Sequence, residues 1–278
     1  MPRPDPQPVL FTDLDGTLLD AETYSWQAAK PALNRLEERN VPWVLCSSKT
    51  RAEMEPLRRA MGHRHPFIVE NGGAILIPEG CFTVPFSADP HAEGGRTVEI
   101  GIPYRLLRIA LQEIARETRT VVKGFGDMNA EEVASQTGLP LNEAERARAR
   151  EYDEPFIIEG TPEQRQAVLS RIESKGFRWT KGGRFPHLTG NNDKGRAVAI
   201  LSEIYRRQYG AILTVGLGDS LNDLPMLAGV DRPVLVRRPD GSYEDAIALP
   251  GLVRADGIGP AGWNKAVLKI LNNSPKSV

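Results

Sequence analysis

Short apolar runs alternate with amphipathic helical patterns along the first third of the chain. Apolar residues at 9–12, 41–46 and 67–69 have the length and composition of buried strands. Between them, residues 26–39 and 54–61 carry apolar side chains at helical spacing. Strands and helices that alternate with short connections are typical of a parallel sheet with crossover helices. The pattern therefore predicts an α/β fold with a doubly wound parallel sheet.

The pattern changes at about residue 89 and returns to its first form at about residue 190. The intervening segment mixes predicted strands and helices, starting with a strand at 97–102 and ending with a hairpin at 177–188. The parallel pattern then resumes and closes with a helix at 263–271. We therefore expect a main domain in two parts, residues 1–88 and 190–278, interrupted by an inserted α+β domain at residues 89–189.

Polar clusters follow several of the predicted strands. Residues 13–17, 47–51 and 70–73 follow the first three, and residues 216–223 follow a strand of the last part. Ligands of parallel α/β sheets bind beyond the carboxyl ends of the strands. We therefore expect these clusters to meet in one crevice.

Two pairs of aspartates fall in these clusters. Asp13 and Asp15 are two residues apart on an extended segment, so both point to one side, and Gly16 lets the chain turn away. Such a pair can hold Mg²⁺, and one member can attack phosphorus while the other moves protons. Asp219 and Asp223 can turn toward the same cation. The alternative is that these aspartates only stabilise turns or cap helices.

A hydroxyl and a lysine stand at two other strand or helix ends. Ser47 ends the second strand, so its hydroxyl and the following amides can bind phosphate oxygens, or it can simply cap a helix. Lys194 begins a helix, where a positive charge opposes the helix dipole. This unfavourable position suggests a role in the crevice, although a surface lysine is the plain alternative.

Composition narrows the classes of partner. The 278 residues include 35 lysines and arginines against 36 acidic residues, so there is no basic surplus to bind nucleic-acid phosphates. Two cysteines are too few for a disulfide framework. No apolar run reaches the roughly 20 residues of a membrane helix, and prolines at positions 2, 4, 6 and 8 occupy the place of a signal peptide's apolar stretch. We expect a cytoplasmic protein with a loose leader and neither nucleic-acid nor membrane partners; the oligomeric state is left open.

Four motifs, in this order, resemble those of the haloacid dehalogenase superfamily of phosphatases. They are Asp13-x-Asp15-Gly16-Thr17, Ser47, Lys194 and Gly218-Asp219-x-x-x-Asp223. The long separation between Ser47 and Lys194 leaves room for the insertion, which resembles the C2-type cap of one branch of that superfamily. Five further segments resemble the mannosyl-3-phosphoglycerate phosphatases of that branch, namely residues 45–50, 70–72, 124–128, 150–156 and 182–185.

The resemblance implies a Mg²⁺-dependent phosphatase for a small phosphorylated sugar-glycerate. It implies that Asp13 takes the phosphoryl group as an aspartyl phosphate, and that Asp15 protonates the departing oxygen and then activates water. Asp13, the main-chain carbonyl of Asp15 and Asp219 would hold the Mg²⁺. An anionic carboxylate can attack an anionic phosphate only where such positive charge is present.

Supporting roles follow from the same resemblance. Ser47 would orient the phosphate, and Lys194 would compensate its charge. Asp223 would orient Lys194 or, with Asn222, support the metal ligands. The insertion would close over the crevice and select the substrate. The expected substrate contacts are Ser48, Lys49, Glu70 and Asn71 on the main domain and Arg184 and His187 on the insertion.

Alternatives remain for the substrate contacts and for the function. Arg184 could merely flank a hairpin turn, and His187 could be an ordinary strand residue. The implied reaction is hydrolysis of mannosyl-3-phosphoglycerate to mannosylglycerate, with glucosyl-3-phosphoglycerate or another sugar phosphate as the alternative substrate. A non-catalytic sugar-phosphate sensor and a mutase or phosphotransferase represent other classes of function.

Overall fold

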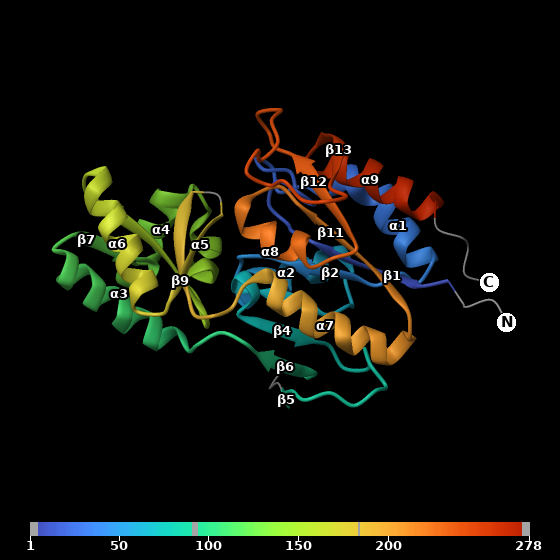
Figure 1. Cartoon of the computed structure of the whole chain (residues 1–278), viewed down its shortest axis with the longest axis horizontal. Helices are drawn as coiled ribbons and strands as arrows, with labels where there is room; N and C mark the ends of the chain where they lie inside the picture. Colours follow the sequence, from blue (N-terminus) through green and yellow to red (C-terminus); the bar gives the residue numbers. More distant parts are fainter. Residues whose placement is uncertain (1–4, 91–93, 183, 274–278) are drawn as a thin grey trace.

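The large sheet of the computed structural model contains nine strands in the order β13-β12-β11-β1-β2-β3-β4-β6-β5 (Figure 1). The structure describes residues 5–90, 94–182 and 184–273. Strands β13 to β3 pair in parallel, and β4, β6 and β5 add an antiparallel edge. This confirms the predicted α/β class. The bounds are β1 Gln7–Thr12, β2 Trp43–Cys46, β3 Phe67–Val69, β4 Ala74–Ile77, β5 Asp89–Pro90, β6 Arg96–Glu99, β11 Ile212–Gly218, β12 Arg232–Arg237 and β13 Val253–Ile258.

Helices cover both faces of the large sheet because alternate residues of each strand point to opposite faces. In β1, Leu10 packs with residues of α1, α2 and α9, whereas Val9 and Phe11 pack with residues of α7 and α8. The first face therefore carries α1 Lys30–Glu38, α2 Arg51–Met61 and α9 Gly259–Asn273, and the second carries α7 Lys194–Tyr209 and α8 Leu224–Ala228. Short 3₁₀ helices are η1 Gln27–Ala29, η2 Glu70–Gly72, η3 Phe125–Asp127 and η4 Leu221–Asp223.

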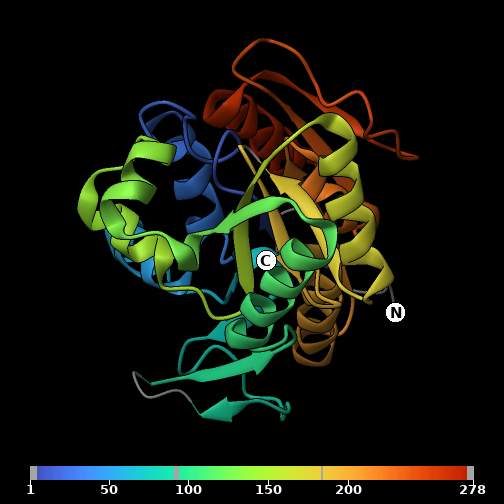
Figure 2. The same ribbon diagram turned by 90° about the vertical axis from the view of Figure 1, so that its left-hand side faces the viewer.

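Residues 104–189, called the cap below, build a second sheet that faces the viewer in Figure 2. Its antiparallel strands follow the order β7-β8-β10-β9. Phe156 and Ile158 of β8 pack with α3 and α6 on one face, and Ile157 packs with α4, α5 and Phe125 on the other. The bounds are α3 Tyr104–Thr118, β7 Val121–Gly124, α4 Ala130–Thr137, α5 Leu141–Arg148, β8 Asp153–Glu159, α6 Pro162–Ser174, β9 Arg178–Gly182 and β10 Phe185–Thr189.

The change from one sheet to the other lies later than the sequence pattern indicates. Strand β6 pairs with β4, so the strand predicted at 97–102 belongs to the large sheet and not to the insertion. Periodicity shows that a segment is extended, but the choice of pairing partner depends on the rest of the fold. The chain enters the cap between Glu99 and Tyr104 and leaves it between Thr189 and Lys194. The other predicted domain limits stay predictions.

The hairpin predicted at 177–188 is present as the antiparallel pair β9 and β10. Gly183, in its predicted turn, lies outside the described residues, as do residues 1–4 of the predicted leader. In the described ranges, no helix has the length and apolar character needed to cross a membrane.

Candidate active site

Asp13 lies at the carboxyl end of β1, between β2 and β11. Its amide donates a hydrogen bond of 2.9 Å to the carbonyl of Leu217, which continues the pairing of β1 with β11 and places Asp13 beside the loop that follows β11. Carboxylate oxygens of Asp13, Asp219 and Asp223 all lie within 4.8 Å of one another, and the three residues are buried. Two segments about 200 residues apart in sequence therefore form one acidic cluster.

Lys194 enters this cluster from the first turn of α7. Its side chain is fully buried, and Nζ donates to Oδ1 of Asp13 and to Oδ1 of Asp223, each at 2.6 Å. Asp193 caps the helix by accepting from the amide of Arg196. The alternative of a solvated surface lysine is therefore excluded, and the unfavourable position at a helix start is explained by two anionic partners.

Burial and mutual repulsion shift the pKa values of the cluster. Burial and then the charge of Asp223 raise the pKa of Asp13 well above its usual range, against the attraction of Lys194. The same two causes raise the pKa of Asp219 to about 7. Burial favours neutral lysine, but Asp13 and Asp223 outweigh it and raise the pKa of Lys194. One lysine thus faces three carboxylates, and without a further cation these carboxylates ionise less readily than usual.

The donor set of this cluster fits a divalent cation. Carboxylate oxygens are the ligands that Mg²⁺ prefers, and three residues supply them within a few ångströms. Gly16, with φ of +79°, passes so close that a Cβ at this position would lie 2.8 Å from Oδ2 of Asp219. The backbone of the Asp13–Thr17 segment therefore approaches the cluster directly, and only glycine allows both the turn and the approach.

Asp15 pairs with Lys49, and both belong to the main body, which is the described part of the chain outside the cap. Its Oδ2 lies 2.9 Å from Nζ of Lys49, while its buried Oδ1 has no hydrogen-bond partner among the described residues. Burial would lower the pKa of Lys49, but the charges of Asp15 and Glu53 outweigh it and raise that pKa. Asp15 is thus held at the rim of the acidic cluster with one oxygen available.

Ser47 is buried at the end of β2 and does not cap α2. Its Oγ accepts a hydrogen bond of 3.1 Å from the amide of Lys49. The cap of α2 is Thr50, which forms a reciprocal capping box with Glu53. The helix-cap alternative for Ser47 is therefore wrong, because the position that satisfies the helix amides lies three residues later.

Asp223 and Asn222 brace the loop after β11. Oδ2 of Asp223 accepts from the amides of Asp219 and Ser220, at 3.0 and 3.1 Å, while Oδ1 binds Lys194. Nδ2 of Asn222 donates to Oδ1 of Asn71 at 3.2 Å. The loop is therefore fixed to the lysine on one side and to the residues after β3 on the other.

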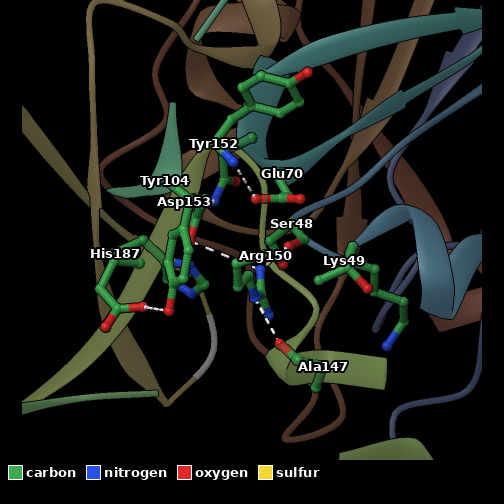
Figure 3. Close-up of polar contacts among 12 residues, drawn as sticks. Ser48, Lys49, Glu70, Tyr104, Ala147, Arg150, Tyr152, Asp153 and His187 are labelled. Atoms are coloured by element: carbon green, nitrogen blue, oxygen red, sulfur yellow. Dashed lines mark hydrogen bonds and ion pairs between the residues drawn. The ribbon is translucent and has the colours of Figure 1, made fainter. Parts of the chain in front are cut away.

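Glu70 joins the main body to the cap. Its carboxylate accepts hydrogen bonds from the backbone amides of Glu151 and Tyr152, at 2.8 to 3.0 Å (Figure 3). Burial raises the pKa of Glu70 to about 8, although Arg150 and the two amides act in the opposite direction. Glu70 therefore lies at the contact between the main body and the cap, which is called the seam below.

Asn71 and His187 meet at a buried carboxylate of the cap. Oδ2 of Asp153 accepts from Nδ2 of Asn71, and Oδ1 lies 2.7 Å from Nδ1 of His187. Burial would raise the pKa of Asp153, but His187, Arg150 and Asn71 outweigh it and lower that pKa. His187 is thus a fixed member of this network, unlike an ordinary strand residue.

A cleft of about 610 Å³ lies between the acidic cluster and the cap. Eight of the residues predicted for the site line it, namely Asp13, Asp15, Ser48, Lys49, Arg184, His187, Asp219 and Asn222. Ser47, Asn71, Lys194 and Asp223 are buried and contact lining residues through the hydrogen bonds above. Glu70 is buried as well, and its hydrogen bonds go to Glu151 and Tyr152, which do not line the cleft. Residues that sequence reasoning missed include Tyr24, Phe125, Arg150, Phe185 and Arg238. Arg150 lies in segment 150–156, which resembles the mannosyl-3-phosphoglycerate phosphatases, but that resemblance assigned no role to its side chain.

Comparisons with known proteins agree with this geometry. Residues 10–85 match the model of the haloacid dehalogenase-like hydrolase family. A glucosyl-3-phosphoglycerate/mannosyl-3-phosphoglycerate phosphatase of Methanococcoides burtonii is 46% identical over 96% of this chain and 98% of its own length. A protein of the same name from Persephonella marina is 43% identical over 95% and 97%, and a mannosyl-3-phosphoglycerate phosphatase of Pyrococcus horikoshii is 38% identical over 82% and 90%.

Solved structures share the fold. A phosphatase of the haloalkanoate enzyme superfamily from Bacteroides thetaiotaomicron superposes with a TM-score of 0.70 at 19% identity, covering 98% of both chains. A protein of Thermoplasma acidophilum gives 0.68 at 21% identity, covering 96% of this chain and 99% of its own. Sequence identity to full-length relatives and the shared fold lead to one conclusion. The chain belongs to the haloacid dehalogenase superfamily, in the branch that contains the mannosyl-3-phosphoglycerate phosphatases.

Proposed function

We propose that this protein is a Mg²⁺-dependent phosphatase that hydrolyses mannosyl-3-phosphoglycerate to mannosylglycerate and phosphate, and that glucosyl-3-phosphoglycerate is a second substrate. The observation that carries the proposal is the buried cluster of Asp13, Lys194, Asp219 and Asp223 at one end of the cleft. The printed names of two full-length relatives include both substrates, which supports the second one. Location in the cytoplasm remains part of this proposal.

Asp13 is the proposed nucleophile. Lys194 binds its Oδ1, which orients the carboxylate and leaves Oδ2 to attack phosphorus. The bond from phosphorus to the glycerate oxygen breaks, and Asp15 supplies the proton that this oxygen needs. Water, activated by Asp15, then attacks phosphorus and releases phosphate from Asp13. Asp15 lines the same cleft, as both proton transfers require.

Charge compensation is the main requirement of this mechanism. When bound by Asp13, Asp219 and the main-chain carbonyl of Asp15, Mg²⁺ supplies positive charge to the phosphoryl oxygens. Lys194 supplies a second, fixed charge, and Asp223 holds its ammonium through a hydrogen bond. Ser47 lies one residue before the cleft-lining Ser48, where its hydroxyl can orient a phosphate oxygen.

Substrate selection is proposed to depend on the seam between the main body and the cap. Ser48 and Lys49 line the cleft from the main body, and Arg184 and His187 line it from the cap. Glu70 and Asn71 are buried and hold the cap segment through hydrogen bonds. The cleft is large enough for a glycosyl phosphoglycerate, since ligand pockets typically span about 300–1,000 Å³.

Phosphate release from a panel of substrates tests the function. The panel contains mannosyl- and glucosyl-3-phosphoglycerate, mannose 6-phosphate and glucose 6-phosphate, each with Mg²⁺ and with a chelator. We expect rapid hydrolysis of the two glycosyl phosphoglycerates with Mg²⁺ and none with the chelator. Preference for the simple hexose phosphates would refute the proposed substrate. Ligand binding without turnover would favour a sensor, and transfer of phosphate to a second sugar would favour a phosphotransferase.

A further inference from the structure

Arg150 occupies the seam between the cap and the main body. It precedes β8 and lines the cleft, and its side chain is only 5% exposed. Figure 3 shows it with Ser48 and Ala147. Its Nε donates to the carbonyl of Ala147 at 2.7 Å and its Nη1 to the carbonyl of Ser48 at 2.8 Å. The guanidinium is therefore anchored by one carbonyl of the cap and one of the main body.

The carboxylates nearest to Arg150 are already bound to other donors. Asp153 lies 3.7 Å and Glu53 lies 3.8 Å from the guanidinium, both beyond hydrogen-bond distance. The oxygens of Asp153 accept from Asn71 and His187, and Oε2 of Glu53 accepts from the amide of Thr50. These two acids balance part of the charge of Arg150 without using its donors.

Arg150 consequently has N–H groups at the edge of the cleft that make no hydrogen bond within the described residues. A guanidinium carries five N–H groups, and two of them make the hydrogen bonds to Ala147 and Ser48. The remaining three have no hydrogen bond of 3.5 Å or less in the described part of the chain. These donors are not among the buried side-chain atoms that lack a partner, so they are open to the solvent of the cleft that Arg150 lines. This arrangement suits an anionic ligand that enters the cleft and completes the set.

We propose that Arg150 binds the carboxylate of the substrate's glycerate moiety, an inference that rests on the proposed function. In a 3-phosphoglycerate, that carboxylate is separated from the phosphate-bearing carbon by one carbon atom. It must therefore lie within a few ångströms of the phosphate, near the seam. Arg150 meets this condition, since it contacts Ser48, which directly follows Ser47.

Lys49 and Arg184, two other cations that line the cleft, are less suitable for this role. Lys49 is committed to Asp15 at 2.9 Å, and its ammonium lacks the planar fork that matches a carboxylate in two places. Arg184 is exposed and bonds to the carbonyl of Thr137. Arg150 therefore combines burial, free donors and the right position. Asp153 is its positioning residue, since it lies beside Nη1 and is itself held from both domains.

The test compares two substrates that differ only in the carboxylate. One is mannosyl-3-phosphoglycerate, and the other is the analogue in which the carboxylate is replaced by a hydroxymethyl group. For Arg150→Gln we expect kcat/KM on the first substrate to fall about 10- to 100-fold, mainly through KM. On the analogue we expect little change. Arg150→Lys keeps the charge but loses the fork, and should fall between wild type and Arg150→Gln.

Several outcomes separate this role from others. An equal loss on both substrates would overturn the proposal, because it would indicate a structural or phosphate-binding role. Arg105→Gln, which removes the same charge from an exposed site on α3, should leave both values unchanged. If Arg150→Gln does not fold by circular dichroism, the same ratio measured on Arg150→Lys decides. Wild-type enzyme that is inactive on both substrates would refute the proposed function itself, whereas activity with an unchanged ratio refutes only the role of Arg150.

Discussion

The two sides of the cleft hold their charged groups in different ways. On the main-body side, charges satisfy one another, as Lys194 does with Asp13 and Asp223. On the cap side, the arginines bond to backbone carbonyls, Arg150 to Ser48 and Ala147 and Arg184 to Thr137. The first arrangement fixes a cluster of charges before any ligand arrives. The second leaves donors available, so it is suited to recognition more than to chemistry.

This difference separates the expected effects of mutation. In the acidic cluster, each group determines the ionisation of its neighbours, so one substitution changes both the chemistry and the balance of buried charge. On the cap side, Asp153 and Glu53 lose part of their charge balance when Arg150 is removed, but they keep hydrogen bonds from other donors. We therefore expect loss of chemistry from the first set and graded changes in substrate preference from the second.

The largest effect is expected for Asp13→Asn. The amide cannot attack phosphorus, so kcat should fall by about 10³-fold or more. The thermal midpoint should be unchanged or higher, because burial and Asp223 already disfavour the charged form of Asp13. Phosphate release and circular dichroism measure the two effects, with the exposed Asp256→Asn as the matched control. Retention of a tenth of the wild-type rate would contradict the role of nucleophile.

Lys194→Met should reduce both activity and stability. Removal of the ammonium leaves Asp13 and Asp223 buried without their cation, and breaking a buried pair typically costs about 3–5 kcal/mol. We expect kcat/KM to fall about 10²- to 10³-fold. Urea unfolding at neutral pH and phosphate release are the measurements, and exposed Lys265→Met is the control. Unchanged stability would show that the lysine and the two carboxylates are not coupled.

The contrast between the two sides also explains what could be predicted from the sequence. Asp13, Ser47, Lys194 and Asp219 stand at strand or helix ends in a recognisable order, so the pattern of elements places them together. The parallel part of the sheet follows from the same periodicity. The partnership of Arg150 with the carbonyl of Ser48 has no such signal, because any residue offers a carbonyl. Membership of β6 in the large sheet is likewise decided by pairing and not by composition.

At the seam, Glu70→Gln should change the pH dependence of stability. Folding raises the pKa of Glu70 from its ordinary 4.5 to about 8, so the folded state binds this proton more tightly. Its stabilising contribution is complete below about pH 4.5 and is lost as the pH rises through 8. Between pH 5 and pH 9, the unfolding free energy of Glu70→Gln relative to wild type should rise by about 1–3 kcal/mol. Urea titrations at both pH values measure it.

The exposed neighbour Glu151 provides the control for that experiment. Glu151→Gln changes the same charge one residue from the same seam, and its stability relative to wild type should be the same at pH 5 and pH 9. An equal pH effect in both variants would mean that general charge and not the burial of Glu70 causes it. Such a result would weaken the assignment of Glu70 to a buried contact between the main body and the cap.

The smallest effect is expected for Arg184→Gln. The guanidinium of Arg184 lies at the solvent-exposed side of the cleft. Within the described residues, its hydrogen bond goes to the carbonyl of Thr137, at 2.9 Å. Water competes with an exposed hydrogen bond of this kind, so the side chain is held weakly and contributes little. We therefore expect kcat/KM to fall about two- to fivefold. Steady-state kinetics beside Arg150→Gln give the comparison. If kcat/KM falls as far in Arg184→Gln as in Arg150→Gln, burial does not determine how much each arginine contributes. Substrate recognition would then be spread over the whole cap side of the cleft.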